Sequence, residues 1–179
     1  MARTIVVKVG TSTLSNADGG IDSGYLQALA DQLCALMNQH HRVVLVSSGA
    51  VRAGVDALRW TARPKSIALK QAAAAVGQGR LMAMYDAVFG ARGKVVGQLL
   101  LTRQLAEERI RYVNAQNTLA ELLKHGALPI INENDTVSTE ELQFGDNDTL
   151  AALVAALVQA DLLILLTNVD GLLDREGRV

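Results

Sequence analysis

The sequence predicts an α/β protein, a three-layer αβα sandwich with a mainly parallel central sheet. Short apolar runs rich in Val, Ile and Leu alternate along the chain with longer segments of helical periodicity. The short runs lack polar alternation, which is typical of parallel strands buried on both faces by helices. Half of the 179 residues are hydrophobic, which is enough for one sizeable core.

The alternation predicts five strands and four long helices. The expected strands are residues 4–9, 42–46, 95–101, 127–131 and 162–166, and the expected helices are residues 22–38, 68–89, 113–125 and 148–159. Gly77 and Gly79 are candidate interruptions of the second helix. Connections between successive parallel strands should be right-handed crossovers. No internal repeat or linker divides the chain, so residues 1–179 are expected to form one domain.

Composition excludes several classes of protein. The net charge is -1 and aromatic residues make up 3% of the chain, which argues against a nucleic-acid-binding surface. A single cysteine, Cys34, allows no disulfide framework within the chain. The N-terminus has no signal-like segment, and no apolar stretch is long enough to span a membrane. We therefore expect a cytoplasmic protein.

The residues that follow each strand are the candidates for chemistry, because open parallel sheets bind ligands beyond the carboxyl ends of their strands. The first strand leads into Lys8-Val9-Gly10-Thr11-Ser12, where a lysine and a close-approaching glycine backbone suit a phosphate. The segment lacks the Walker A and dinucleotide-loop patterns. The alternative is an ordinary tight turn after a lysine that extends into solvent.

The second strand leads into Ser47-Ser48-Gly49. At a strand-to-helix turn this segment suits an anion such as a substrate carboxylate, because helix N-terminal N–H groups are free there. The alternative is that Ser47 or Ser48 only caps the following helix.

Two dense polar clusters lie after the fourth strand. Asn132-Glu133-Asn134-Asp135 follows the strand directly, and Gly145-Asp146-Asn147-Asp148 opens the next helix. Grouped carboxylates and amides attract an ammonium group or a hydrated divalent cation. The alternatives are that Asp146 or Asn147 caps the helix and that the first cluster is a solvated turn. Thr167-Asn168, after the fifth strand, suits either a nucleotide contact or a simple turn.

The chain offers no Ser-His-acid set and no metal-ligand spacing. This pattern suits a reaction that needs no protein base, such as phosphoryl transfer to a carboxylate. A carboxylate is already ionised at neutral pH, so catalysis reduces to positioning and charge neutralisation.

Several motifs taken together resemble the glutamate 5-kinases of the amino-acid kinase family. The resemblance extends in order along nearly the whole chain. Single motifs are shared with aspartate, acetylglutamate, carbamate and uridylate kinases. The combination of Asn-Glu-Asn-Asp at 132–135, Gly-Asp-Asn-Asp at 145–148 and Val-Gly-Gln at 76–78 points to the glutamate branch. The motifs are Val6–Ser12, Val46–Ala50, Ala75-Val76-Gly77-Gln78, 97–102, 129–135 and 145–148.

The resemblance implies a reaction and its participants. The reaction is ATP-dependent phosphorylation of the L-glutamate side-chain carboxylate, the first step of proline biosynthesis, with Mg2+ bound through the nucleotide phosphates. Proline would be a feedback inhibitor, and the protein would be a homo-oligomer, a dimer or tetramer. The implied roles are catalysis and phosphate contact for Lys8, phosphate contact for Gly10, glutamate binding for Ser48, Asp135 and Asn147, and nucleotide contact for Thr167 and Asn168. Asn168 departs from the Thr-Asp pair usual in the family.

The resemblance also implies that the domain is truncated at its C-terminus. Family members continue with further nucleotide-binding sequence, and many then carry a small PUA domain. We therefore expect residues 1–179 to hold the substrate-binding part and the start of the nucleotide-binding part, and to bind ATP poorly. The alternatives are a kinase for aspartate or acetylglutamate, and a non-catalytic amino-acid-binding module. A Rossmann dehydrogenase fits less well, because the first loop lacks its glycine spacing.

Overall fold

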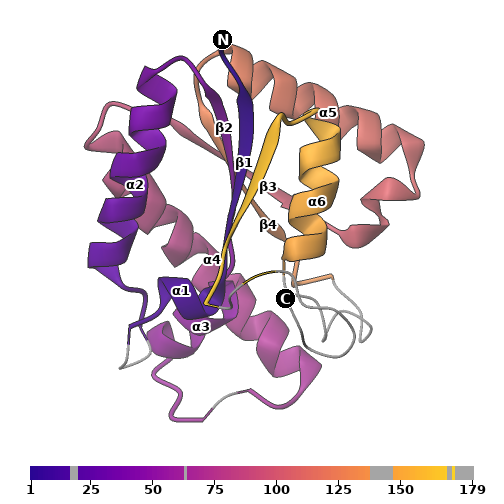
Figure 1. The fold of residues 1–179 in the computed structure, drawn as a ribbon. Helices are drawn as coiled ribbons and strands as arrows, with labels where there is room; N and C mark the ends of the chain where they lie inside the picture. The colour runs from indigo at the N-terminus through magenta and orange to yellow at the C-terminus, as the bar shows by residue number, and fades with distance from the viewer. Residues whose placement is uncertain (17–19, 63, 138–146, 169–170, 172–179) are drawn as a thin grey trace.

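The computed structural model describes residues 1–16, 20–62, 64–137, 147–168 and 171. In that part of the chain, five parallel strands form one sheet with the order β3-β4-β2-β1-β5 (Figure 1). The α/β class and the parallel sheet predicted from the sequence are confirmed. The strands are β1 (Thr4–Val9), β2 (Arg42–Val46), β3 (Val96–Leu101), β4 (Leu128–Glu133) and β5 (Leu162–Leu166).

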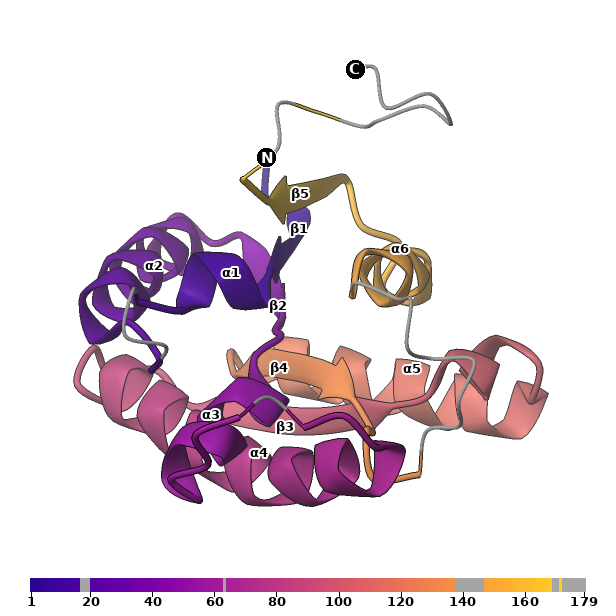
Figure 2. The ribbon, with the colours of Figure 1, turned by 90° about the horizontal axis from the view of Figure 1, so that it is seen from below.

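Helices cover both faces of the sheet, giving three layers (Figure 2). α2 and α4 lie on one face with α1, and α5 and α6 lie on the other, so the predicted sandwich is confirmed. The helices are α1 (Thr11–Leu14), α2 (Ser23–Asn38), α3 (Ala50–Ala57), α4 (Ile67–Gly90), α5 (Arg109–Lys124) and α6 (Asp148–Leu157), with a 3-10 turn at Arg103–Ala106.

The two cores follow from the alternation of side chains along the strands. In β1, Val7 packs on the α2–α4 side, where Tyr85 and Phe89 are fully buried. Its neighbour Val6 packs on the α5–α6 side, beside Leu119. β1 is therefore buried at every position, because it is covered from both sides.

Burial on both faces holds for β1, β2 and β4 but not for β3 and β5. These two strands are the edges of the sheet, and each is partly open. Leu162 and Leu165 of β5 are 42% and 38% exposed, although β5 is as apolar as the central strands. An apolar run thus identifies a strand without fixing whether it lies at the centre or the edge.

The two glycines in α4, candidate interruptions in the sequence, do not interrupt the helix. α4 runs without a break from Ile67 to Gly90. A Cβ at Gly77 would lie 1.8 Å from the carbonyl oxygen of Ala50, so glycine there permits close contact with α3. A Cβ at Gly79 would meet nothing within 4 Å. Tertiary packing stabilises the helix despite the low helix propensity of both residues.

Three boundaries differ from the predictions by two residues or more. α5 begins at Arg109 rather than at residue 113, because its exposed first turn carries no apolar pattern. α6 ends at Leu157, and Gln159 takes a left-handed φ of 49°. β4 continues through Glu133. No helix in the described ranges is both long and apolar enough to cross a membrane.

Candidate active site

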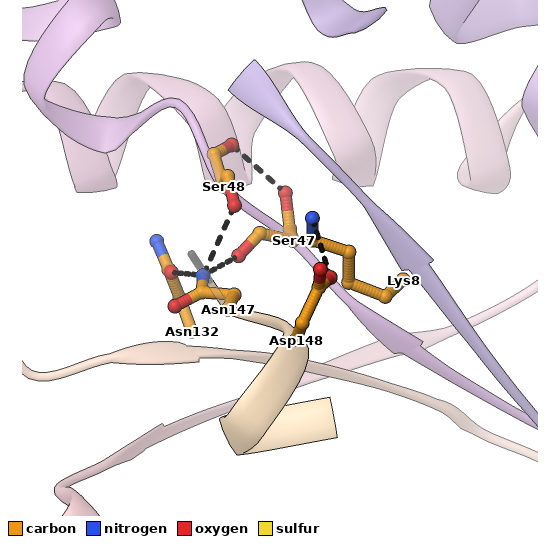
Figure 3. Close-up of polar contacts among 6 residues, drawn as sticks. All are labelled: Lys8, Ser47, Ser48, Asn132, Asn147 and Asp148. Carbon is orange, nitrogen blue, oxygen red and sulfur yellow. Dashed lines mark hydrogen bonds and ion pairs between the residues drawn. The ribbon is translucent and has the colours of Figure 1, made fainter. Parts of the chain in front are cut away.

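Polar side chains from distant parts of the sequence meet at the carboxyl ends of the central strands (Figure 3). Lys8 comes from β1, and Ser48 follows β2. Asn132 comes from β4, and Asn147 and Asp148 stand at the start of α6. Of the site residues expected from the sequence, Lys8, Ser48 and Asn147 therefore lie in one spatial cluster.

Lys8 is buried and forms an ion pair at this cluster. Its side chain is 2% exposed, and Nζ lies 2.7 Å from Oδ1 of Asp148, whose side chain is 45% exposed. A buried ammonium requires a compensating negative group. Asp148 lies in the first turn of α6, where the helix dipole favours a carboxylate. The alternative interpretation, a lysine extending into solvent, is therefore wrong.

Gly10 lies directly beside the Lys8 ammonium. A Cβ at position 10 would lie 3.5 Å from Lys8 Nζ. A side chain at position 10 would contact the ammonium, and its absence suits a phosphate group that approaches both the ammonium and the backbone. Gly10 is also the residue before the short helix α1, where the sequence predicted a loop.

Neither serine after β2 caps α3. The residue before α3 is Gly49, which has a left-handed φ of 101°, and no side chain caps the helix. Ser47 Oγ instead donates to the carbonyl oxygen of Ser48 at 3.1 Å and lies 2.7 Å from Tyr85 Oη. The capping interpretation is therefore wrong, and the serines belong to the site.

Asn147 precedes α6 but its side chain does not cap that helix. Its amide nitrogen donates to Ser47 O at 2.5 Å, to Asn132 Oδ1 at 2.8 Å and to Ser48 Oγ at 3.1 Å. Asn147 thus connects the loop after β2 to β4. An NH2 group has two hydrogens, so one of these three contacts is shared.

Asn132 and Glu133 belong to β4 and not to a solvated turn. They pair in register with Leu100 and Leu101 of β3, and they are 3% and 8% exposed. Burial of polar side chains at a strand end requires partners. Asn132 meets this requirement with contacts to Asn147 and to the side chain of Gln78 in α4.

Asp135 lies just beyond β4 and is half-buried. Burial and the neighbouring Glu133 carboxylate raise the pKa of Asp135 from 3.8 to about 6. A cationic group beside Asp135 would relieve both effects, so this position suits an ammonium ion. Gly145 and Asp146 of the second cluster lie outside the described residues.

Thr167 and Asn168 follow β5, the neighbour of β1 in the sheet. Val9 pairs with Leu166, so Gly10 and Thr167 leave adjacent strands at the same level. Both Thr167 and Asn168 are exposed. This placement agrees with a position beside a phosphate bound near Lys8.

Three residues of the cluster were given no individual role from the sequence. Asp148 belonged to the second polar cluster at the start of a helix, and Tyr85 was predicted only as part of a long helix. Gln78 belonged to a motif with no assigned role. Asp148 was detectable in principle, because a carboxylate in the first turn of a helix beyond a strand end is a suitable partner for Lys8. The described residues contain no group of three or more His, Cys, Asp or Glu side chains able to hold a metal ion.

Comparisons with known proteins agree with this architecture. The amino acid kinase family matches residues 3–179. A protein of Nostoc punctiforme named glutamate 5-kinase is 55% identical over 179 residues, which cover 99% of this chain and 49% of that relative. Proteins of the same name from Caldanaerobacter subterraneus and Clostridium acetobutylicum are each 52% identical over 175 residues, 98% of this chain, and these cover 47% and 66% of those relatives.

The chain thus spans about half the length of the first two of these curated relatives. The family match extends over nearly all of the chain, from the residue before β1 to the last residue. The parallel sheet and the polar cluster at its carboxyl edge lie within the matched residues. This chain belongs to the amino acid kinase family.

Proposed function

We propose that this chain is part of a glutamate 5-kinase, which transfers the γ-phosphoryl group of ATP to the side-chain carboxylate of L-glutamate. The observation that carries the proposal is the buried Lys8 ammonium at the sheet edge, paired with Asp148 and lying beside Gly10. Its relatives of about half or more sequence identity are named glutamate 5-kinase, which supports glutamate as the acceptor.

In the proposed reaction, a side-chain carboxylate oxygen of glutamate forms a bond to the γ-phosphorus. The bond from that phosphorus to the β–γ bridging oxygen breaks, and ADP leaves. No proton is transferred in this step, so the reaction needs no general base, and none is assigned to the site. Lys8 would neutralise charge on the transferred group, and Asp148 would hold Lys8 in place.

The acceptor would be held by groups on the other side of the cluster. The Asp135 carboxylate would receive the α-ammonium group, and the Ser48 hydroxyl would donate to a carboxylate. Asn147 would fix Ser48 and contribute to the glutamate pocket through its position above β4. These roles follow from charge and hydrogen-bonding capacity, since an ammonium and a carboxylate need opposite partners.

The donor would lie along the edge formed by β1 and β5. Lys8 and Gly10 would contact the phosphates, and Thr167 and Asn168 would lie beside the nucleotide. The buried ammonium and the adjacent backbone of Gly10 fit a phosphate group. Magnesium would arrive with the nucleotide phosphates and supply further charge neutralisation. We also propose proline as a feedback inhibitor at the glutamate site and a homo-oligomeric assembly.

The test is to trap an acyl phosphate with hydroxylamine while offering L-glutamate, L-aspartate and N-acetyl-L-glutamate in parallel with magnesium and ATP. Calorimetric titration with the same acids accompanies it. We expect glutamate to be preferred in both assays. A preference for another acid would identify a different amino-acid kinase. Glutamate binding without any trapped product, in a protein that carries the complete domain, would favour a non-catalytic binding module.

A further inference from the structure

We propose that Gln78 is a positioning residue, which orients the side-chain amides of the site so that Ser48 presents its hydroxyl proton to the substrate carboxylate. Gln78 Oε1 accepts a hydrogen bond of 2.8 Å from Asn132 Nδ2. Asn132 Oδ1 in turn accepts from Asn147, which also donates to Ser48 Oγ. Four side chains from α4, β4, the start of α6 and the loop after β2 thus form one chain of hydrogen bonds.

The direction of this chain is fixed at two points by backbone groups. The backbone N–H of Glu133 donates to Asn132 Oδ1 at 2.9 Å, so the oxygen of that amide must face Glu133. The carbonyl oxygen of Ser47 accepts from Asn147 Nδ2, so the nitrogen of that amide must face Ser47. Backbone groups cannot exchange donor and acceptor roles, and they therefore determine the orientation of both amides.

Gln78 supplies the acceptor that the hydrogen-bonded series of side chains still requires, the one for the Asn132 NH2 group. Because Asn132 Oδ1 faces Glu133, its NH2 group faces α4, where Asn132 is 3% exposed and needs an acceptor. Gln78 Oε1 supplies that acceptor. If Gln78 Oε1 were lost, the Asn132 NH2 group could not find another acceptor by a half-turn rotation of the amide. That rotation would place the Asn132 nitrogen against the Asn147 NH2 group and the Glu133 N–H, so that three donors would face one another.

The consequence for the substrate arises at Ser48. Asn147 Nδ2 faces Ser48 Oγ, so that oxygen can only accept from it. The hydroxyl proton of Ser48 is then left to donate elsewhere, and Ser48 is only half-buried, so a ligand can approach it. This arrangement suits an anionic ligand group and disfavours an ammonium. The inference thus deepens the proposed function and rests on it for the identity of the ligand.

The helix that carries Gln78 is held firmly against the site. A Cβ at the preceding residue, Gly77, would lie 1.8 Å from Ala50 O and 2.3 Å from Gly54 N, so α3 and α4 are in backbone contact there. Tyr85, two turns further along α4, reaches Ser47 through its hydroxyl. α4 therefore holds the loop after β2 through Tyr85 and β4 through Gln78.

The experiment compares three variants of this chain by calorimetric titration with L-glutamate. Gln78→Leu removes the acceptor, and Gln78→Glu retains it. Gln32→Leu makes the same exchange on an exposed position of α2 and is the control. We expect affinity to fall about fivefold to tenfold in Gln78→Leu, the effect of one lost hydrogen bond, and to change less in Gln78→Glu. A role in packing alone predicts the reverse order, because leucine fills the space without adding charge.

A second measurement separates this inference from the proposed function. In the ligand-free chain, the side-chain NH2 resonances of Asn132 and Asn147 are followed by 15N–1H correlation spectra. Gln78→Leu should shift the NH2 resonances of both Asn132 and Asn147. Gln78→Glu should shift the Asn147 resonances little, and Gln32→Leu should shift the resonances of neither residue. Unchanged Asn132 and Asn147 signals in a folded Gln78→Leu variant would overturn the inference, whatever the ligand.

The two measurements together distinguish the possible failures. If the unaltered chain binds no glutamate, the proposed ligand is wrong, and the amide resonances alone decide the role of Gln78. If it binds glutamate and the affinity order of the two Gln78 variants is reversed, the proposed function stands and the positioning role is rejected. Should Gln78→Leu fail to fold, Gln78→Glu still tests the inference, because a large shift of the Asn147 resonances in a variant that retains an acceptor at position 78 would overturn it.

Discussion

The Lys8 ammonium and the Asp148 carboxylate form an ion pair of 2.7 Å between the end of β1 and the first turn of α6. Lys8 is almost fully buried, whereas Asp148 is half-exposed. Removing one partner of the pair therefore affects the remaining partner differently, depending on which of the two is removed. Asp148 can be hydrated when Lys8 is removed, whereas Lys8 stays enclosed when Asp148 is removed.

Asp148→Ala is expected to lower the free energy of unfolding by about 1 to 3 kcal/mol, because a buried ammonium loses its carboxylate partner. Urea denaturation measures the change. Glu121→Ala, which removes the partner of Lys124 in an exposed pair, is the control and should cost less than about 1 kcal/mol. An equal loss of unfolding free energy in the two variants would show that burial of Lys8 does not increase the contribution of Asp148 to stability.

Gly77→Ala is expected to destabilise the chain by about 1 to 3 kcal/mol or more, because its Cβ would overlap the backbone of α3. Glutamate affinity should fall as well, since α3 begins directly after the Ser47-Ser48-Gly49 loop. Gly79→Ala, at an open position of the same helix, should instead stabilise the chain by up to about 1 kcal/mol. Thermal unfolding of the two variants checks this; a stable Gly77→Ala protein contradicts the close contact.

Tyr85→Phe and Ser47→Ala remove the same hydrogen bond but should differ in cost. Tyr85→Phe leaves Ser47 with the Ser48 carbonyl as a partner, so about 0.5 to 1.5 kcal/mol is expected. Ser47→Ala leaves the fully buried Tyr85 hydroxyl without that partner, and about 1 to 3 kcal/mol is expected. Burial is also what raises the pKa of Tyr85. Denaturant titration of both variants gives the comparison, and a larger loss in Tyr85→Phe would refute the assignment.

Glutamate affinity is expected to rise with pH through about 6, the raised pKa of Asp135, because only the ionised carboxylate attracts the ammonium. The ligand-free chain should show the opposite trend in stability. A carboxyl with a raised pKa in the folded state stabilises it below the unfolded value of 3.8, and this stabilisation is lost as pH rises through about 6.

Asp135→Asn tests both trends. It should abolish the rise in affinity and, above pH 6, stabilise the ligand-free chain by on the order of 2 kcal/mol. Calorimetry and thermal unfolding between about pH 4.5 and 8 measure the two effects. Affinity of the Asp135→Asn variant equal to that of the unaltered chain at pH 8 would exclude contact between Asp135 and the ammonium.

The strands were the most predictable part of the fold. The bounds of β1, β2 and β5 match those predicted, because buried parallel strands are short apolar runs bounded by polar residues. β4 was predicted to end at Ile131, since Asn132 and Glu133 are polar. They remain in the sheet because β3 pairs with them and because the surrounding amides satisfy the Asn132 side chain.

The candidate site was predictable in its location but not in its connections. Lys8, Ser48 and Asn147 each follow or end an element at the carboxyl edge of the sheet, and the rule for open parallel sheets brings such residues together. Of their partners, Asp148 had a local signal, a carboxylate in the first turn of a helix, whereas Gln78 had none. Gln78 lies in the middle of a helix whose rotation about its axis is set by packing, and no local pattern indicates which face meets the site.

The sequence by itself determined the fold class, the alternation of strands and helices, and the strand ends at which polar side chains gather. These features depend on local periodicity and on the geometry common to parallel sheets. Only the tertiary structure decided that Lys8 is buried against Asp148, that Asn147 bridges Ser47 and Asn132 without capping its helix, and that Gln78 fixes the orientation of Asn132. Each of these relationships joins residues far apart in the chain, and burial and donor–acceptor matching exist only once the elements are packed.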